Sequence, residues 1–363
     1  MNNDTSNHNK KKYRVLSIDG GGMRGLFSCS YLQGMVNTSK SKYGVDLNDL
    51  GKEFDLIVGT STGAILGAGL AAGVPLPEIC NLYTEFGLKI FPEKLPESKS
   101  KLLLHNRPKL NKAGDEALRA VLKSNFGDLT LAELYKERKI GLAITSVNCT
   151  THRAYVFKTP HDSSSNHRDD DITLADACLA SSAAPIYRSI AVINQTELNL
   201  DDSMFIDGGL WANNPVLVAL IEALRNTTDA HEIEIFCLGT SPAPTGSVLE
   251  ANDPHWGLIK WKFGGRAIDY AMDSQTTVYD DMATKLLAHI NRDVSIMRFT
   301  QPVPSADQAS LLALDDASPE SMKLLKQLAS RAVDQTNQLM NGGGDKGKRI
   351  AALFGDKCEE IEE

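Results

Sequence analysis

The segment from Asp55 to Gly73, DLIVGTSTGAILGAGLAAG, has no charged side chain after its first residue. A segment of this length can cross a membrane or be buried in a protein core. Its composition argues against a membrane span, because residues 56–77 include five glycines, two prolines and a central Thr-Ser-Thr run. The pattern predicts a short β-branched strand and a helix of small residues, joined by a tight turn. The segment is therefore expected to be a buried strand–turn–helix unit.

Other segments repeat this alternation of strands and helices. Residues 14–18, RVLSI, predict a first strand that runs into a glycine loop, and a helix is expected from about residue 26 to 36. Further strands are expected in residues 140–148, 153–159, 203–209 and 232–240. Such alternation predicts an α/β fold with a mainly parallel central sheet and helices on both of its faces. In these folds, the functional site lies at the carboxyl ends of the strands.

Composition narrows the class of protein. The 363 residues are 42% hydrophobic and 23% charged, which is typical of a globular chain with a large core. The net charge of −8 argues against a nucleic-acid partner. The six cysteines form no CxxC pair, so neither a zinc ribbon nor a disulfide framework is indicated. The polar N-terminal residues lack the apolar core of a signal peptide, so a cytoplasmic location is expected.

The turn in the opening segment carries the motif G-x-S-x-G, formed by Gly59, Thr60, Ser61, Thr62 and Gly63. A serine on a sharp strand-to-helix turn needs small neighbours, because the backbone passes close on both sides. Its hydroxyl then stands above the sheet edge, and the following helix directs N–H groups toward a developing anion. This motif predicts a nucleophile elbow centred on Ser61.

A glycine loop follows the first strand and contains Gly20, Gly21, Gly22, Arg24 and Gly25, directly after Asp19. Three successive glycines expose backbone N–H groups, as an oxyanion hole requires. The loop also fits the dinucleotide-binding string G-x-G-x-x-G, although no ribose-binding acidic residue is found at the usual offset, and the P-loop pattern is absent. A non-catalytic nucleotide-binding module is therefore kept as an alternative.

A third loop, Asp207-Gly208-Gly209, follows a predicted strand and supplies a candidate base. None of the eight histidines lies in a glycine-rich loop at a strand end. His255 and His289 follow Asp207, as the chain order of an α/β-hydrolase triad requires, so a triad with either of them stays open. The sequence nevertheless favours Asp207 as the base, because burial in an apolar site makes a carboxylate a better proton acceptor.

The three loops, in this order, resemble those of the patatin-like phospholipases. The matching motifs are D-G-G-G-x-R-G at residues 19–25, G-x-S-x-G at 59–63 and D-G-G at 207–209, followed by Asn213-Asn214-Pro215. The segment ASSAAPIY at residues 180–187 is also similar to a block of that family. The resemblance covers roughly residues 13–240. It implies a catalytic domain over 13–240, after a disordered lead-in of residues 1–12. A mostly helical part, 241–363, is expected to pack on the same domain.

The resemblance further implies a three-layer α/β/α patatin-like fold and a Ser-Asp dyad. Ser61 is expected to be the nucleophile and Asp207 its general base. The residues Gly20, Gly21, Gly22, Arg24 and Gly25 are expected to form the oxyanion-hole loop. The expected substrates are acyl esters of membrane phospholipids, and neither a metal nor a cofactor is required.

Three expectations concern partners. The substrate implies peripheral contact with the inner membrane surface, for which residues 255–266, HWGLIKWKFGGR, combine aromatic and basic side chains. A partly buried helix with snorkelling lysines explains the same residues. The resemblance also suggests a bacterial subgroup of antiphage effectors that are switched on by a cyclic dinucleotide. No nucleotide-binding motif identifies the site of such an activator. The third expectation is that the chain forms a homo-oligomer.

Overall fold

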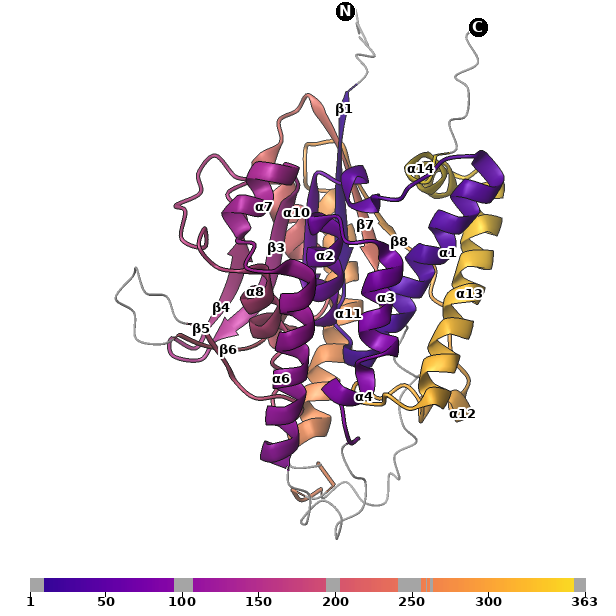
Figure 1. The fold of residues 1–363 in the computed structure, drawn as a ribbon. Helices are drawn as coiled ribbons and strands as arrows, with labels where there is room; N and C mark the ends of the chain where they lie inside the picture. Colours follow the sequence, from indigo (N-terminus) through magenta and orange to yellow (C-terminus); the bar gives the residue numbers. More distant parts are fainter. Residues whose placement is uncertain are drawn as a thin grey trace, which may run out of the picture.

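An eight-stranded, mostly parallel sheet organises the computed structural model (Figure 1). The structure describes residues 10–94, 107–193, 203–240, 256–258, 260–261 and 264–355. The strands are β1 (Lys11–Ile18), β2 (Leu56–Thr60), β3 (Gly141–Asn148), β4 (Arg153–Lys158), β5 (Ala191–Ile193), β6 (Ser203–Asp207), β7 (His231–Leu238) and β8 (Val294–Arg298).

The parallel part of the sheet is built around β1. Strands β2 and β7 pair with β1 on its two edges, β3 pairs with β2, and β8 pairs with β7, all in parallel. The remaining three strands are antiparallel: β4 and β6 pair with β3, and β5 pairs with β6. The carboxyl ends of the parallel strands therefore meet at one edge, where the three motif loops begin.

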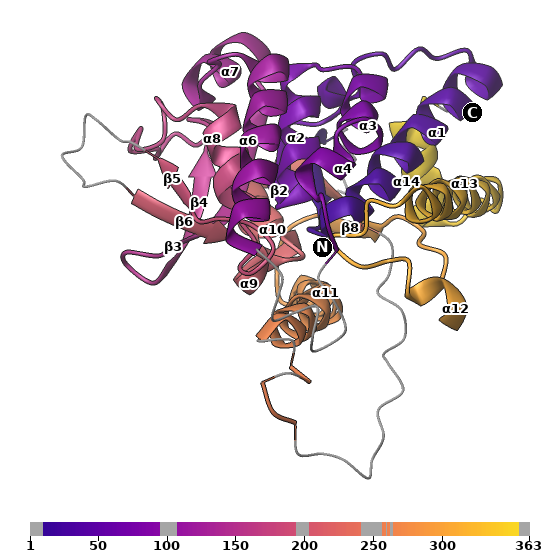
Figure 2. The same ribbon diagram turned by 60° about the horizontal axis from the view of Figure 1, so that its bottom comes forward.

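Helices cover both faces of the sheet, as Figures 1 and 2 show. One face carries α1, α2, α3, α6 and α8, and the opposite face carries α10 and α11. The expected three-layer α/β/α fold with a mainly parallel sheet is confirmed. The α-helices are α1 (Gly25–Tyr43), α2 (Thr62–Ala72), α3 (Leu76–Thr84), α4 (Gly87–Ile90), α6 (Arg107–Phe126), α7 (Leu131–Arg138), α8 (Leu174–Ser181), α9 (Gly209–Ala212), α10 (Val216–Asn226), α11 (Gly265–Leu287), α12 (Ala306–Ala309), α13 (Pro319–Asn341) and α14 (Asp345–Leu353). Two short 3₁₀ helices are η1 (Gly22–Arg24) and η2 (Leu50–Glu53).

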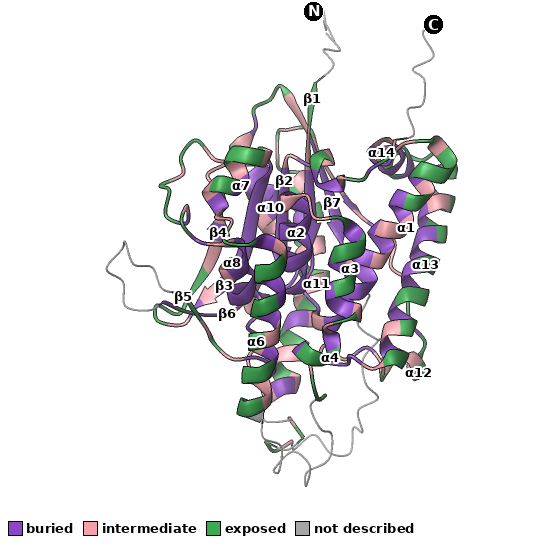
Figure 3. Cartoon of the chain, viewed as in Figure 1, coloured by how far each residue is buried: buried purple, intermediate pink, exposed green. Residues whose placement is uncertain are grey.

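Alternate residues of the central strands enter the two cores. Leu16 of β1 and Ile57 of β2 pack under α1 and α2, whereas Val15 and Val58 pack under α10. Strands that are covered on both faces need apolar residues at successive positions, which explains why these strands read as continuous hydrophobic runs. Figure 3 shows this buried centre, with the exposed residues concentrated on the outer sides of the helices.

The segment from Asp55 to Gly73, which has no charge after its first residue, forms β2, a turn and α2. Every residue of α2 except its last is buried. Within the part of the chain that the structure describes, no helix combines the length and the apolar character of a membrane span. The lack of charge in this segment thus follows from burial within the fold, as the sequence predicts.

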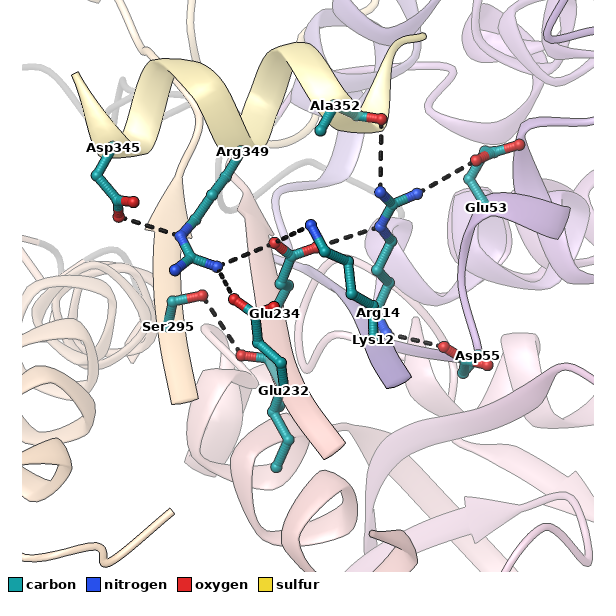
Figure 4. A network of polar contacts seen from close by, with 11 residues as sticks. Lys12, Arg14, Glu53, Asp55, Glu232, Glu234, Ser295, Asp345, Arg349 and Ala352 are labelled. Atoms are coloured by element: carbon teal, nitrogen blue, oxygen red, sulfur yellow. Dashed lines mark hydrogen bonds and ion pairs between the residues drawn. The ribbon is translucent and has the colours of Figure 1, made fainter. Parts of the chain in front are cut away.

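The C-terminal part joins the sheet through β8 and through α14, which lies across the start of β1 and β7 (Figure 4). The fully buried carboxylate of Glu234 on β7 binds Arg349 of α14 at 3.0 Å and Arg14 of β1 at 3.2 Å. Lys12 lies 3.3 Å from the same carboxylate. A buried charge needs such partners, so this network fixes α14 to the sheet.

Several predicted boundaries differ from the structure. Strand β1 begins at Lys11, inside the segment expected to be a disordered lead-in, because it pairs with β7 from that residue onward. Residues 1–9 lie outside the described residues. The helix expected from about residue 26 to 36 is α1, which extends over Gly25–Tyr43.

Candidate active site

The register of the sheet brings the predicted nucleophile and base together. One edge of β3 pairs with β4 along residues 143–148, and its other edge is shared by β2 and β6. Thr60, the last residue of β2, pairs with Thr145, and the next residue of β3, Ser146, pairs with Asp207 of β6. Strands β2 and β6 therefore meet end to end along β3. This arrangement places Asp207 beside the turn that follows Thr60.

Ser61 stands on a strained turn between β2 and α2. Its φ of 55° and ψ of −122° lie outside the conformations that most residues adopt. The turn is tight enough that a Cβ on Gly59 would lie 2.5 Å from the Gly63 carbonyl oxygen. A Cβ on Gly63 would lie 2.4 Å from the carbonyl oxygen of Ile18 on β1. Both glycines of the motif are thus required sterically, which is the geometry of a nucleophile elbow.

Ser61 and Asp207 are in direct contact. The Ser61 hydroxyl Oγ donates a hydrogen bond of 2.6 Å to Oδ2 of Asp207, and both residues are buried. The other carboxylate oxygen, Oδ1, accepts a 2.7 Å hydrogen bond from the backbone N–H of Gly209. A carboxylate held on one oxygen and aimed at a hydroxyl with the other is arranged to accept the hydroxyl proton.

Burial changes the acidity of Asp207. It raises the pKa of this carboxyl to about 6, although the hydrogen bonds from Ser61 and Gly209 and the charge of Arg188 all lower it. A base with a pKa closer to neutrality accepts a proton more readily than an ordinary aspartate does. The fold therefore gives Asp207 the property that the sequence analysis expects of a general base.

The glycine loop lies directly against Ser61, since a Cβ on Gly20 would lie 3.3 Å from Cβ of Ser61. The N–H of Gly20 donates to the Asn213 carbonyl at 2.9 Å, and the N–H groups of Arg24 and Gly25 donate to carbonyls within the loop. Among the described residues, no acceptor is found for the N–H groups of Gly21 and Gly22. Of the five loop residues named from the sequence, these two can offer a hydrogen bond to a substrate.

The remaining motif residues hold the site together. Thr60 Oγ1 lies 2.7 Å from Oγ1 of Thr145, and Thr62 Oγ1 lies 2.6 Å from the hydroxyl of Tyr83. Gly208 packs on β3, where a Cβ would lie 2.4 Å from the Thr145 carbonyl oxygen. These residues act on the position of Ser61 and Asp207, and their side chains are not arranged for proton transfer.

A pocket adjoins Ser61, and its lining is mostly apolar. Ser61, Asp207 and Gly22 lie on its wall. Helices α3, α4, α6 and α11 supply further lining residues, including Leu82, Ile90, Leu118 and Met272. Such a lining suits a hydrocarbon chain attached to the group that reacts with Ser61.

The structure does not support a histidine as the base. No histidine lines this pocket among the described residues. His289 is exposed after the end of α11, and His161 is buried against Thr159 and Glu222. His255 lies outside the described residues. In the same described ranges, no group of three or more His, Cys, Asp or Glu residues could hold a metal ion.

Comparison with known proteins decides the family. The family model for patatin-like phospholipases matches residues 16–220, more than half of the chain. The chain belongs to the patatin-like phospholipase family. A cGAMP-activated phospholipase of Vibrio cholerae serotype O1 is 32% identical over 361 residues, which cover 96% of each chain. An Escherichia coli protein of the same name is 30% identical, covering 93% of this chain and 94% of that protein. A cUMP-AMP-activated phospholipase of Escherichia coli is 28% identical over an alignment that covers 68% of this chain and 71% of that protein.

Membership of the patatin-like phospholipase family makes the chain a lipid acyl hydrolase. It argues against the two alternatives kept open from the sequence, the histidine triad and the non-catalytic nucleotide-binding module. The match of the family model ends at residue 220, whereas the two cGAMP-activated relatives align with more than nine-tenths of the chain.

Helix α11 carries no recognised motif, but it fixes two loops of this patatin-like site, the segment after Asp207 and the glycine loop. The Gln275 side chain accepts a 2.9 Å hydrogen bond from the Asn213 N–H and donates a 3.0 Å bond to the Leu210 carbonyl. One turn later, Asp280 accepts a 2.7 Å bond from the Asn214 side chain. These contacts hold the segment that follows Asp207, and Met272 of the same helix lines the pocket.

Asp280 also connects α11 with the glycine loop. It binds the guanidinium of Arg298 on β8, and this guanidinium contacts the buried Asp19 carboxylate at 2.7 Å. Burial raises the pKa of Asp19 to about 6, against the opposing charge of Arg298. The start of the glycine loop is thus tied to the Asp207 loop through a residue from the last third of the chain.

The segment ASSAAPIY and the residue after it also serve the site. The Ser61 N–H donates a 2.8 Å hydrogen bond to Oγ of Ser181, and the Asp207 N–H donates a 3.0 Å bond to the Ala183 carbonyl. Arg188, which the sequence analysis does not name, lines the pocket and is held by Asp115 of α6 at 2.6 Å. Arg188 is buried, and its guanidinium also lies 5.8 Å from the centre of the Phe91 ring, so its partners come from segments that are distant in sequence.

Proposed function

We propose that this protein cleaves fatty-acyl esters of membrane phospholipids with Ser61 as nucleophile and Asp207 as general base. Asp207 Oδ2 takes the proton of Ser61 as Oγ attacks the ester carbonyl, and the new oxyanion faces the N–H groups of Gly21 and Gly22. The C–O bond to the glycerol then breaks, and the leaving lysophospholipid oxygen takes the proton from Asp207. A water molecule, deprotonated by Asp207, releases the fatty acid and restores Ser61.

The observation that carries this proposal is the 2.6 Å hydrogen bond between Ser61 and Asp207 at the wall of an apolar pocket. The pocket accepts the acyl chain, so the ester carbonyl comes to rest between the hydroxyl and the glycine loop. Mass spectrometry of phospholipid vesicles incubated with purified protein tests the reaction. Free fatty acid and lysophospholipid are expected in equal amounts after short incubations, and neither forms if the proposal is wrong.

The activity is expected to rise with pH through the ionisation of Asp207. The base acts only as a carboxylate, and its pKa is about 6, so kcat/KM should fall tenfold per pH unit well below pH 6 and be constant above pH 7. Because the folded-state pKa is raised above the unfolded value, the contribution of Asp207 to stability is fully present below pH 4 and lost as the pH rises through 6. Loss of activity at pH 5 therefore does not reflect unfolding caused by this group.

A pH–rate profile with a water-soluble ester, accompanied by circular dichroism at each pH, measures this effect. Asp19 has a similar pKa, so the profile is repeated with Asp19→Asn, in which the acid limb should persist. A profile that is flat between pH 5 and 8, or an acid limb that Asp19→Asn removes, contradicts the assignment of Asp207.

We further propose that a cyclic dinucleotide switches this hydrolase on, as a step of bacterial antiphage defence. The support is the similarity over nearly the whole chain to relatives named for activation by cGAMP. Phospholipid hydrolysis is expected to rise tenfold or more with one of cGAMP, cUMP-AMP or cyclic di-GMP. A rate that none of the three changes contradicts the activation and leaves the hydrolase proposal standing.

A further inference from the structure

Three elements that line the catalytic pocket come together at one end of the molecule. The helix α4, the first turns of α6 and the first turns of α11 lie at the lower end of Figure 1, and Figure 2 brings this end forward. Helix α4 packs against α6, and Asn111 of α6 donates a 3.1 Å hydrogen bond to the Ile186 carbonyl. The next residue, Tyr187, contacts α11 instead, because its hydroxyl donates a 3.2 Å hydrogen bond to Asp269 of that helix. The three elements therefore meet around Ile186 and Tyr187, at the end of the pocket that Ile90, Leu118 and Met272 line.

Apolar side chains project into solvent from these elements and from the described residues just before α11. Leu258 is 71% exposed, Leu88 of α4 is 55% exposed and Tyr270 of α11 is 42% exposed. Trp261 joins the group, with its ring 5.3 Å from that of Trp256 and 6.2 Å from that of Tyr270. Tryptophan and tyrosine beside exposed leucines are typical of a protein surface that enters the interfacial region of a bilayer.

Lysines accompany these apolar side chains. Lys89 of α4, Lys109 and Lys112 of α6, and Lys260 are all exposed. Two acidic residues of the same elements instead face the protein, since Asp115 binds Arg188 and Asp269 accepts from Tyr187. Glu116 lies 4.0 Å from Lys112, so that lysine is partly neutralised. The chain as a whole carries a net charge of −8, so a cluster of cations at this end is a local property.

We propose that this end of the molecule is the surface that docks on an anionic phospholipid bilayer, which rests on the proposed function. The docking rim consists of the apolar Leu88, Trp256, Leu258, Trp261 and Tyr270, and of Lys89, Lys109, Lys112 and Lys260. The apolar members enter the acyl boundary while the lysines bind lipid phosphates. This end of the pocket then faces the bilayer, and an acyl chain can pass from the membrane into the pocket without crossing water.

The positive charge of the docking rim favours an anionic bilayer over a second copy of this chain as its partner. In a symmetric dimer through the rim, the same patch meets itself, so the lysines of the two copies would face one another. Like charges placed together in this way oppose association. An anionic bilayer instead offers phosphates at any spacing that the four lysines adopt.

The first test changes one exposed apolar residue. Leu258→Asp should weaken binding to vesicles of phosphatidylglycerol and phosphatidylethanolamine, measured by co-sedimentation, by about tenfold or more, because an apolar anchor is replaced by a charge. Ile221→Asp is the matched control, since Ile221 is 56% exposed on α10, a helix that is not among the described lining of the pocket. That variant should bind vesicles as the wild type does.

The second test removes the charges. The combined replacement of Lys89, Lys109, Lys112 and Lys260 by glutamine should weaken binding to the anionic vesicles by about a hundredfold. Binding to phosphatidylcholine vesicles should change little. Hydrolysis of a water-soluble short-chain ester is measured for all variants with cGAMP present and absent. It should stay within about twofold of the wild type, because the rim lies outside the pocket wall.

Each outcome decides a specific point. Vesicle binding that survives both rim changes, or that Ile221→Asp reduces as strongly, overturns the docking rim. A wild-type protein that binds no vesicle also overturns it, as does a rim variant that alters only the oligomeric state in light scattering. Failure of the wild type to hydrolyse the soluble ester counts against the proposed function instead, while the co-sedimentation result still decides the rim.

Discussion

Replacing Ser61 with alanine is expected to lower phospholipid hydrolysis by about 10⁵-fold or more, because no acyl-enzyme can form without the hydroxyl. The fold should remain intact, since the substitution removes one buried oxygen whose hydrogen bond goes to the Asp207 carboxylate. Lipid mass spectrometry measures the loss of turnover. Intact-protein mass spectrometry with a fluorophosphonate probe gives an independent measure, because the wild type should gain one adduct and Ser61→Ala none.

Ser274→Ala is the matched control for this prediction. Ser274 is an exposed serine on α11, two residues from the pocket residue Met272, and its hydroxyl bonds only to the Ala271 carbonyl among the described residues. Its removal should leave both turnover and labelling unchanged. Residual hydrolysis by Ser61→Ala within a hundredfold of the wild type contradicts the assignment of the nucleophile.

The local parts of the site could be predicted from the sequence because they follow from local backbone geometry. The elbow around Ser61 and the glycine loop are each defined by neighbouring residues whose spacing has a steric meaning. The pairing of Ser146 with Asp207 is different, because it depends on β6 meeting the end of β2 along β3. Only the combined motifs of the family indicated from the sequence that Asp207 approaches Ser61.

The supporting contacts could not be predicted in this way. Gln275, Asp280 and Arg298 reach the catalytic loops from a helix and a strand whose sequences match no motif. Each of these side chains is an ordinary polar residue in a segment expected only to be mostly helical. Their roles depend on tertiary position, which hydrophobic periodicity does not encode. The same reasoning applies to Arg188, which acquires its place through Asp115.

Replacing Asp207 with asparagine is expected to lower kcat by about 10⁴-fold while leaving substrate binding nearly unchanged, because an amide of the same shape cannot accept the Ser61 proton. Single-turnover measurements with a chromogenic ester should show that acylation itself is slowed. Asp19→Asn provides the comparison: this second buried carboxylate directly follows strand β1 and has a pKa of about 6, but it binds Arg298. It should lose about tenfold at most, and equal losses in the two variants contradict the role of Asp207 as base.

The same substitution should make the protein more stable at neutral pH. Burial raises the pKa of Asp207 from 3.8 to about 6, so the ionised form is disfavoured in the folded state. Above pH 7, a shift of this size lowers the free energy of unfolding by about 3 kcal/mol. An asparagine avoids this loss, although its amide group needs a hydrogen-bond acceptor. Urea unfolding at pH 7.5 should therefore show Asp207→Asn to be about 2 kcal/mol more stable than the wild type, a difference that vanishes near pH 4. Greater stability together with lost turnover is the expected signature of a carboxylate kept charged for catalysis, whereas a structural aspartate would lose stability on the same change.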